Sequence, residues 1–235
     1  FAMALTSTGQ VYAWGQDNHG QLGDGRLRQA VSPVPVLVRL PHNARVTAVS
    51  AGGAHALALT SGGQVLAWGS DSDGQLGDGP LGQGQDQRIP GPVLLRARVT
   101  AISAGGRHSL ALTAADEVLA WGDNSQGQLG DGTTTDRSRP APVQLSLVIG
   151  QAVAEISAGS VHSMLLTSDQ QVLNWGGNSR QQLGINQTIN QTLPVSPIVP
   201  QLGPNNGPIP GFTIGAGPAS TNSFMIASSA LLKVP

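Results

Sequence analysis

The chain of 235 residues contains no cysteine, a single lysine (Lys233) and no apolar run long enough to cross a membrane. Without cysteine it forms no disulfide, no thiolate metal site and no cysteine nucleophile. Charged residues make up 11% of the chain against a typical ~25%, and the formal net charge is -1. No basic surface is therefore expected to hold nucleic acid, and no membrane insertion is expected.

Aromatic residues are also few, at 3%, but the tryptophans are regularly spaced. Trp14, Trp68, Trp121 and Trp175 each precede a glycine and follow one another at intervals of 54, 53 and 54 residues. A fixed period of about 50 residues indicates one supersecondary unit that stacks on copies of itself. Glycine (32) and proline (16) are abundant beside 39% hydrophobic residues, which is typical of a folded protein dense in turns.

Each repeat predicts four antiparallel strands. In the third copy, apolar positions in 99–103, 108–113 and 117–121 are separated by Gly-Gly or short polar turns, which is a hairpin pattern. A fourth strand follows at a Pro-x-Pro element. Because proline cannot donate a ladder hydrogen bond, this strand is expected at the outer edge of its sheet. The pattern predicts an all-β fold, a β-propeller of four-stranded antiparallel blades with about four and a half blades in this chain.

We expect one incomplete propeller domain spanning 1–235. Its repeats are predicted at approximately 1–45, 46–98, 99–152 and 153–211, with a partial repeat at 212–235. Each tryptophan closes the third strand of its blade. We expect the four indole rings to be structural, filling the wedge between neighbouring blades while the N–H finds a carbonyl.

Three short motifs recur in register: Ala-Gly-Gly-x-His-Ser-Leu-Ala-Leu-Thr, Val-x-Ala-Trp-Gly and Gly-Gln-Leu-Gly-Asp-Gly. Copies occur at 1–25, 55–79, 108–132 and 162–184. On these motifs the chain resembles the regulator of chromosome condensation repeat family, whose members fold as seven-bladed propellers. Seven blades would need about 370 residues, so the resemblance implies further Trp-Gly units before Phe1. The alternative is a short chain whose open edges are completed by a second copy.

The resemblance also carries expectations about setting and activity. Secreted bacterial members share the low charge and the lack of cysteine, which favours a bacterial-type, extracellular protein. The founding family performs guanine-nucleotide exchange on a small GTPase, but this chain has no compact acidic cluster or long wedge insertion for that role. The ultraviolet-sensing plant relative has a Gly-Trp-Arg-His-Thr cluster that is absent here.

Three histidines, His55, His108 and His162, occupy equivalent positions in successive repeats. Imidazole is a common metal ligand, but ligands of one ion must converge to about 2 Å from it, and these residues belong to different blades. We therefore expect structural histidines that hydrogen-bond to backbone at the turn after Gly-Gly.

The loop that begins Asp71-Ser-Asp73-Gly74 resembles the start of a calcium loop, but its twelfth position, which should be a bidentate carboxylate, falls at Gly82. We interpret these residues as turn formers. No phosphate-binding loop with lysine and no Gly-x-Ser-x-Gly elbow is present. The sequence predicts no metal, no cofactor and no enzyme activity.

The segments 80–89, 133–139 and 185–193 differ most between repeats and all follow the Gly-Gln-Leu-Gly element. Variable loops on a rigid scaffold are the usual carriers of recognition, although they also serve as plain solvated connectors. We expect a non-catalytic scaffold that binds another protein, or a second copy of itself, through one propeller face. A structural subunit that assembles by blade completion is an alternative. The candidate contact residues are Asp86, Arg88, Asp136, Arg137, Arg139, Asn186 and Asn190.

Overall fold

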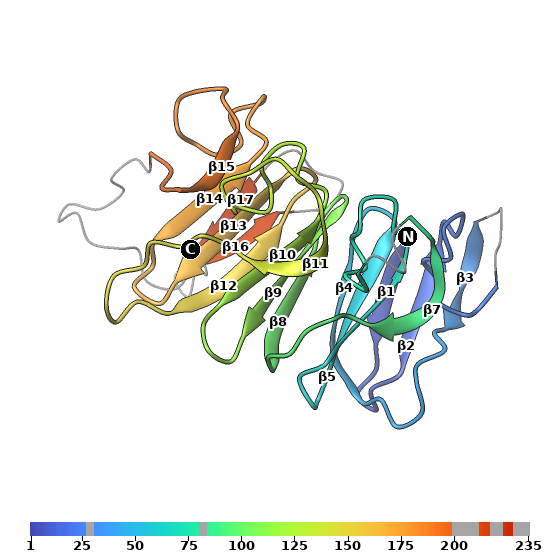
Figure 1. Ribbon diagram of the computed structural model, residues 1–235. Coiled ribbons are helices and arrows are strands. Elements are labelled where there is room, and N and C mark those ends of the chain that lie inside the picture. Colours follow the sequence, from blue (N-terminus) through green and yellow to red (C-terminus); the bar gives the residue numbers. More distant parts are fainter. Residues whose placement is uncertain (27–30, 80–83, 199–211, 217–222, 228–235) are drawn as a thin grey trace, which may run out of the picture.

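The computed structural model describes residues 1–26, 31–79, 84–198, 212–216 and 223–227. Within these ranges the chain forms antiparallel β-strands and no helix. The strands make five sheets, called blades 1 to 5 here, which follow one another in chain order (Figure 1). The all-β propeller architecture is confirmed, with three complete blades, one blade of three strands and one of two.

Blade 1 consists of β1 (Ala2–Leu5), β2 (Val11–Gly15) and β3 (Ser32–Leu37). Blade 2 consists of β4 (Val46–Ala51), β5 (His55–Thr60), β6 (Val65–Gly69) and β7 (Gln87–Pro92). Blade 3 consists of β8 (Val99–Ala104), β9 (His108–Thr113), β10 (Val118–Gly122) and β11 (Arg137–Pro142). Blade 4 consists of β12 (Val153–Ala158), β13 (His162–Thr167), β14 (Val172–Gly176) and β15 (Gln191–Val195). Blade 5 contains β16 (Phe212–Ala216) and β17 (Ser223–Ala227), and the strand expected at 230–234 lies outside the described residues.

Every blade is a simple meander. The first strands β4, β8 and β12 contact each other in turn along the inside of the fan. The Pro-x-Pro strands β3, β7 and β11 lie at the outer edges, as expected, and so does β15, which carries Pro194. Phe1 occupies the histidine position of blade 1. Its Cα approaches Gly15 as the Cα of His55 approaches Gly69. The first blade therefore starts at its second strand, while the division of the chain into one domain of five repeats stays a prediction.

The hydrophobic core lies between blades rather than within them. On β5, Leu57 and Leu59 pack toward blade 3, whereas Ala56 and Ala58 pack toward blade 1. The strand is buried along its whole length because both of its faces are covered. Small side chains on one face leave room for the large side chains of the neighbouring blade, so the alternation of Ala and Leu sets the spacing of the blades.

Backbone hydrogen bonds connect the blades near the inner strands. The Gly53 amide donates to the Gly105 carbonyl at 3.0 Å, and the Gly106 amide donates to the Gly159 carbonyl at the same distance. The Ala104 amide donates to Ser50 Oγ at 2.9 Å, and this bond recurs between the next two blades. Each turn after the inner strand is thus anchored on the next turn around the axis.

This close approach explains the second glycine of the Ala-Gly-Gly turn. A Cβ added to Gly106 would lie 2.3 Å from the carbonyl oxygen of Ser160, whereas one added to Gly91 meets nothing within 4 Å. We expect Gly106→Ala to lower the free energy of unfolding by about 1–3 kcal/mol, because the blades must separate to admit the methyl group. Gly91→Ala is the matched control. Urea unfolding measures both, and equal effects would contradict the role assigned to the turn.

Candidate functional site

The connection after the third strand of each blade folds over the edge of the next blade. In blade 2 this connection contains Gln75, whose carbonyl accepts a hydrogen bond from Trp121 Nε1 of blade 3 at 2.9 Å. Leu76 is buried in the same inter-blade cluster as Trp121. A Cβ added to Gly77 would lie 2.7 Å from Trp121 Nε1, so only glycine fits there. The Gly-Gln-Leu-Gly element and the next tryptophan are therefore two halves of one contact.

The same contact holds Trp68 and Trp175. Their Nε1 atoms donate to the carbonyls of Gln21 and Gln128 at 3.0 and 2.8 Å, and both rings are fully buried. Trp14 departs from the expectation that every ring is a buried wedge, because it is only half-buried. For Trp68, Trp121 and Trp175 the acceptor in this contact comes from the preceding repeat.

The histidines bridge neighbouring blades. His55 Nε2 lies 2.9 Å from Ser109 Oγ, and Ser109 Oγ donates to the Gln75 carbonyl at 2.9 Å. Because the Ser109 hydroxyl donates its proton to that carbonyl, its oxygen accepts a hydrogen bond from His55 Nε2. His55 is therefore the tautomer with the proton on Nε2. His108 makes the same bond to Ser163. The expected backbone partner is therefore wrong for His55 and His108, whose Nε2 atoms bond to a serine of the next blade.

Burial keeps the three rings neutral. It lowers the pKa of His55 to about 4 and that of His162 to about 4. Burial also lowers the pKa of His108 to about 3, with smaller contributions from the neighbouring His162 and His55. Each ring packs on the first glycine of its turn, since a Cβ on Gly52 would lie 2.6 Å from His55 Cε1. The histidines thus act as neutral spacers between blades.

Among the described residues, no group of three or more His, Cys, Asp or Glu side chains is arranged to hold a metal ion. The Asp71 loop is built as a turn. Asp71 Oδ1 accepts from the Leu76 amide at 2.9 Å, and Gly74 has a φ of 81°, in the left-handed region that favours glycine.

The described parts of the variable segments share one face of the fan with the turns at 52–54, 105–107 and 159–161. The Ser70 amide donates to the Ala54 carbonyl, and the Asp123 amide donates to the Arg107 carbonyl. We call this the loop face and define it by these turns and the described residues 70–79, 84–86, 123–136 and 177–190. The opposite hairpin face carries the turns 6–10, 60–64, 113–117 and 167–171.

Three of the predicted contact residues also hold the loop face together. Asp86, Asp136 and Asn190 each accept a hydrogen bond from the backbone amide of the residue that opens the connection, at 3.3, 2.7 and 2.8 Å. Asp86 Oδ2 also lies 2.8 Å from His19 Nδ1 of blade 1, and Asn190 Nδ2 donates to Gln126 Oε1 of blade 3 at 2.7 Å.

A sequence signal for this role exists and was missed. Asp136 and Asn190 both follow the opening asparagine by 12 residues. In the second repeat the separation is 15 residues because that loop is longer. A constant spacing of Asp or Asn from a turn-forming Asn indicates an internal hydrogen bond as readily as a binding residue.

The remaining candidates differ in exposure. Arg88, Arg139 and Asn186 are exposed, and Asn186 has a left-handed φ of 54°. Arg137 is half-buried and donates through Nε and a terminal nitrogen to Asp131 Oδ2 at 3.0 and 2.8 Å. These two bonds tie Arg137 to Asp131 within the same connection. Arg137 is thus the only one of the seven that is half-buried, and the other six are exposed. Partner contact by the whole set stays a prediction.

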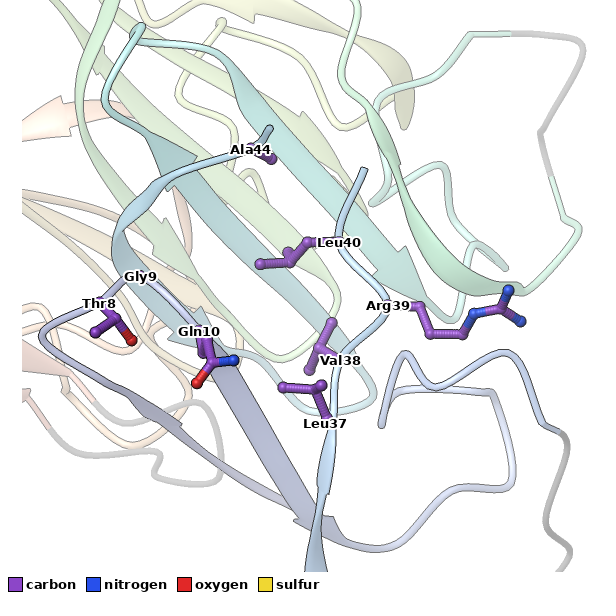
Figure 2. A pocket seen from close by; sticks show the side chains of 8 residues that line it. All are labelled: Thr8, Gly9, Gln10, Leu37, Val38, Arg39, Leu40 and Ala44. Atoms are coloured by element: carbon purple, nitrogen blue, oxygen red, sulfur yellow. The ribbon is translucent and has the colours of Figure 1, made fainter. Parts of the chain in front are cut away.

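A shallow pocket lies on the hairpin face of blade 1 (Figure 2). Its volume is about 430 Å³, and Leu37, Val38 and Leu40 line it opposite Thr8 and Gln10. Arg39 points away from the hollow in the same view. Because no set of polar groups converges on the pocket, it lacks the few oriented polar contacts that fix a ligand.

The repeats and their inter-blade contacts agree with a known family. The sequence matches the RCC1-like domain over residues 1–228. The chain belongs to this family. Its RCC1-like domain is 33% identical over 199 residues to the mitochondrial RCC1 domain-containing protein RUG3 of Arabidopsis thaliana, which covers 82% of this chain and 44% of RUG3. It is 31% identical over 195 residues to the Arabidopsis ultraviolet-B receptor UVR8, again over 82% of this chain and 43% of the relative.

Solved structures agree on the fold. Yeast RCC1 (Prp20), in its crystal structure with Kap60, has a TM-score of 0.76 and 25% identity, covering 96% of this RCC1-like domain and 51% of that chain. Human WBSCR16 has a TM-score of 0.81 at 22% identity, covering 97% and 55%. The chain spans about half the length of these structures and less than half of RUG3 and UVR8.

The expectation of a bacterial-type, extracellular member finds no support, because the sequence relatives reported above come from a plant. Another relative is human, the probable E3 ubiquitin-protein ligase HERC6, with 34% identity over 80% of this chain but only 18% of HERC6. Within the described residues, no helix is long and apolar enough to cross a membrane.

Proposed function

We propose that this RCC1-like domain is a non-catalytic scaffold whose loop face binds another protein. The observation that carries the proposal is the contrast between a frame repeated in every blade and three connections that differ in length and sequence on one face. The frame is rigid because buried tryptophans and inter-blade hydrogen bonds hold it. The exposed Arg88, Arg139 and Asn186 project from that frame.

The solved relatives support protein binding as the general role. Yeast Prp20 was crystallised with Kap60, and a second Prp20 structure was described together with binding to Gsp1p and histones. The identity of those partners is not carried over to this chain. The chemistry of its own loop face, with exposed arginines beside Asp86 and Asp136, favours a partner surface that carries both signs of charge.

Site-specific photo-crosslinking in the full-length protein tests the proposal. A photoreactive residue is placed at Arg88, Arg139 or Asn186 on the loop face, and at the exposed Ser61, Ala115 or Ser168 on the hairpin face as matched controls. We expect one protein to be captured from the three loop-face positions and not from the controls. The affinity of the purified protein for the captured partner should then fall at least tenfold in an Arg88→Ser/Arg139→Ser variant, since interface arginines are frequent hot spots.

Two outcomes would count against the loop face. Capture from the hairpin face alone would move the site to the other side of the propeller. Undiminished binding by the double arginine variant would show that these side chains are solvated connectors.

A further inference from the structure

The residue that opens each connection on the loop face occupies a place surrounded by hydrogen-bond acceptors. In blade 3 this residue is Asn124, and its Oδ1 accepts from the Leu129 amide at 3.0 Å. Its Nδ2 donates to Asp131 Oδ1 at 3.2 Å, and to Thr133 O, Thr133 Oγ1 and Thr135 O at 3.1 Å each. The site therefore needs one acceptor atom and one donor atom.

Blade 4 follows the same rule. Asn178 Oδ1 accepts from the Leu183 amide at 3.0 Å, and its Nδ2 donates to the carbonyls of Gln187 and Ile189 at 2.7 and 3.2 Å. An asparagine meets both needs without changing its charge. Blades 3 and 4 thus share a side-chain donor at this place, whereas blade 1 carries an aspartate, Asp17, whose Oδ1 accepts from the Leu22 amide at 3.0 Å.

In blade 2 an aspartate, Asp71, stands in this place. Asp71 Oδ1 accepts from the Leu76 amide at 2.9 Å, so Oδ2 takes the position of the amide nitrogen. Asp71 is fully buried, and its Oδ2 has no hydrogen-bond partner within the described ranges. The counterpart of Asp131 is Asp78, whose buried Oδ1 also lacks a partner there. Two acceptor oxygens thus occupy places that a donor–acceptor pair fills in blade 3.

We propose that Asp71 carries a proton on Oδ2 and shares it with Asp78, so that this connection of the loop face is held by a proton where blades 3 and 4 use an asparagine amide. One proton satisfies both buried oxygens, whereas two buried unpaired carboxylates would be strongly unfavourable. Loss of the proton loosens the contacts of Asp71 with Gly84 and Asp86, because the same residue holds both. Its amide donates to Asp86 Oδ1 and its carbonyl accepts from the Gly84 amide at 2.9 Å.

The surrounding charges favour the protonated form. The pKa of Asp71 is raised to about 7, chiefly by burial and in smaller part by the carboxylates of Asp78 and Asp86, while the Leu76 and Gly84 amides oppose the shift. Burial also raises the pKa of Asp78. From neighbouring elements, His19 of blade 1 contacts Asp86, and Arg139 of β11 approaches Gly79 beside Asp78. Neither donates to Asp71 Oδ2.

The direction of the pH dependence follows from the raised pKa. The stability that the protonated Asp71 contributes is complete below about pH 3.8 and is lost as pH rises through about 7. Between about pH 3.8 and about 7, one proton changes the equilibrium between the folded and the opened connection by up to about tenfold per pH unit. The idea that this proton regulates the loop face rests on the proposed function. The presence of the proton on Asp71 can be tested without any partner.

Hydrogen exchange in the full-length protein tests the shared proton. Protection factors of the amides in 71–79 are compared between the wild-type protein and Asp71→Asn at pH 5 and pH 7, after correction for intrinsic exchange. We expect the ratio of variant to wild-type protection to rise up to about 100-fold between these pH values. Asp116→Asn, an exposed residue on the hairpin face whose left-handed φ of 60° asparagine tolerates, should leave the ratio unchanged.

Infrared spectroscopy supplies an independent readout. The carbonyl stretch of a protonated carboxylic acid should be present in the wild-type protein at pH 6 and absent in Asp71→Asn. A protection ratio that does not change with pH, or the absence of this band, would overturn the proposal. Addition of Ca²⁺ at pH 8 that restores protection in the wild-type protein but not in the variant would also overturn it, since a cation would then take the place of the proton.

Discussion

Replacement of Trp121 by alanine is expected to lower the free energy of unfolding by about 3–5 kcal/mol. The ring is fully buried between blades 2 and 3, and its loss leaves a cavity lined by Leu57, Leu76 and Val93. It also leaves the Gln75 carbonyl without the indole donor at 2.9 Å. The cost of the cavity and the cost of the unpaired carbonyl add. The carbonyl stays buried, and the neighbouring blade is a rigid sheet that cannot move in to fill the cavity.

Trp14 provides the matched control. It occupies the same sequence position in blade 1 but is only half-buried. Trp14→Ala in this same 235-residue chain should therefore cost less than half of the loss at Trp121. Urea unfolding followed by far-ultraviolet circular dichroism measures both. Equal losses would show that the cost comes from the strand itself and not from the contact between blades.

Acid is expected to unfold the domain between about pH 6.5 and pH 4. The pKa values of His55, His108 and His162 are lowered to about 4, 3 and 4, below the unfolded value of 6.5. The unfolded chain therefore binds protons that the folded chain does not, so the contribution is complete above pH 6.5 and is lost as pH falls toward 4. By pH 5 this costs about 2 kcal/mol for each histidine, or about 6 kcal/mol for three, which is comparable to the stability of a typical domain.

Blade 1 itself suggests the variant that isolates this effect. Phe1 replaces the histidine there, and Ala56 of blade 2 stands where Ser109 and Ser163 accept the imidazole in later blades. His108→Phe/Ser163→Ala should remove about one third of the acid sensitivity between pH 7 and pH 5 and leave stability at pH 7 within about 1 kcal/mol. The slope of unfolding free energy against pH measures this. An unchanged slope would mean that other groups govern acid unfolding.

Much of the fold was predictable because the repeat encodes it locally. Trp-Gly at a period of about 53 residues, apolar strand pairs and Pro-x-Pro edges each constrain a few neighbouring residues, and copies of the unit stack in chain order. The position of Phe1 at the start of a second strand followed from the same register. The partners of the functional side chains were less accessible, since they depend on contacts between blades.

The sequence by itself determined the blades, their register and the face that carries the variable connections, because these follow from local strand, turn and glycine patterns. Only the tertiary structure decided that His55 bonds to a serine 54 residues away, that Trp14 is half-buried, and that Asp86, Asp136 and Asn190 also brace the loop face. It alone revealed that Asp71 takes the place of an amide donor. The reason is that hydrogen bonding and burial at these atoms are set by the neighbouring blade or by a returning loop, and neither is encoded within the segment itself.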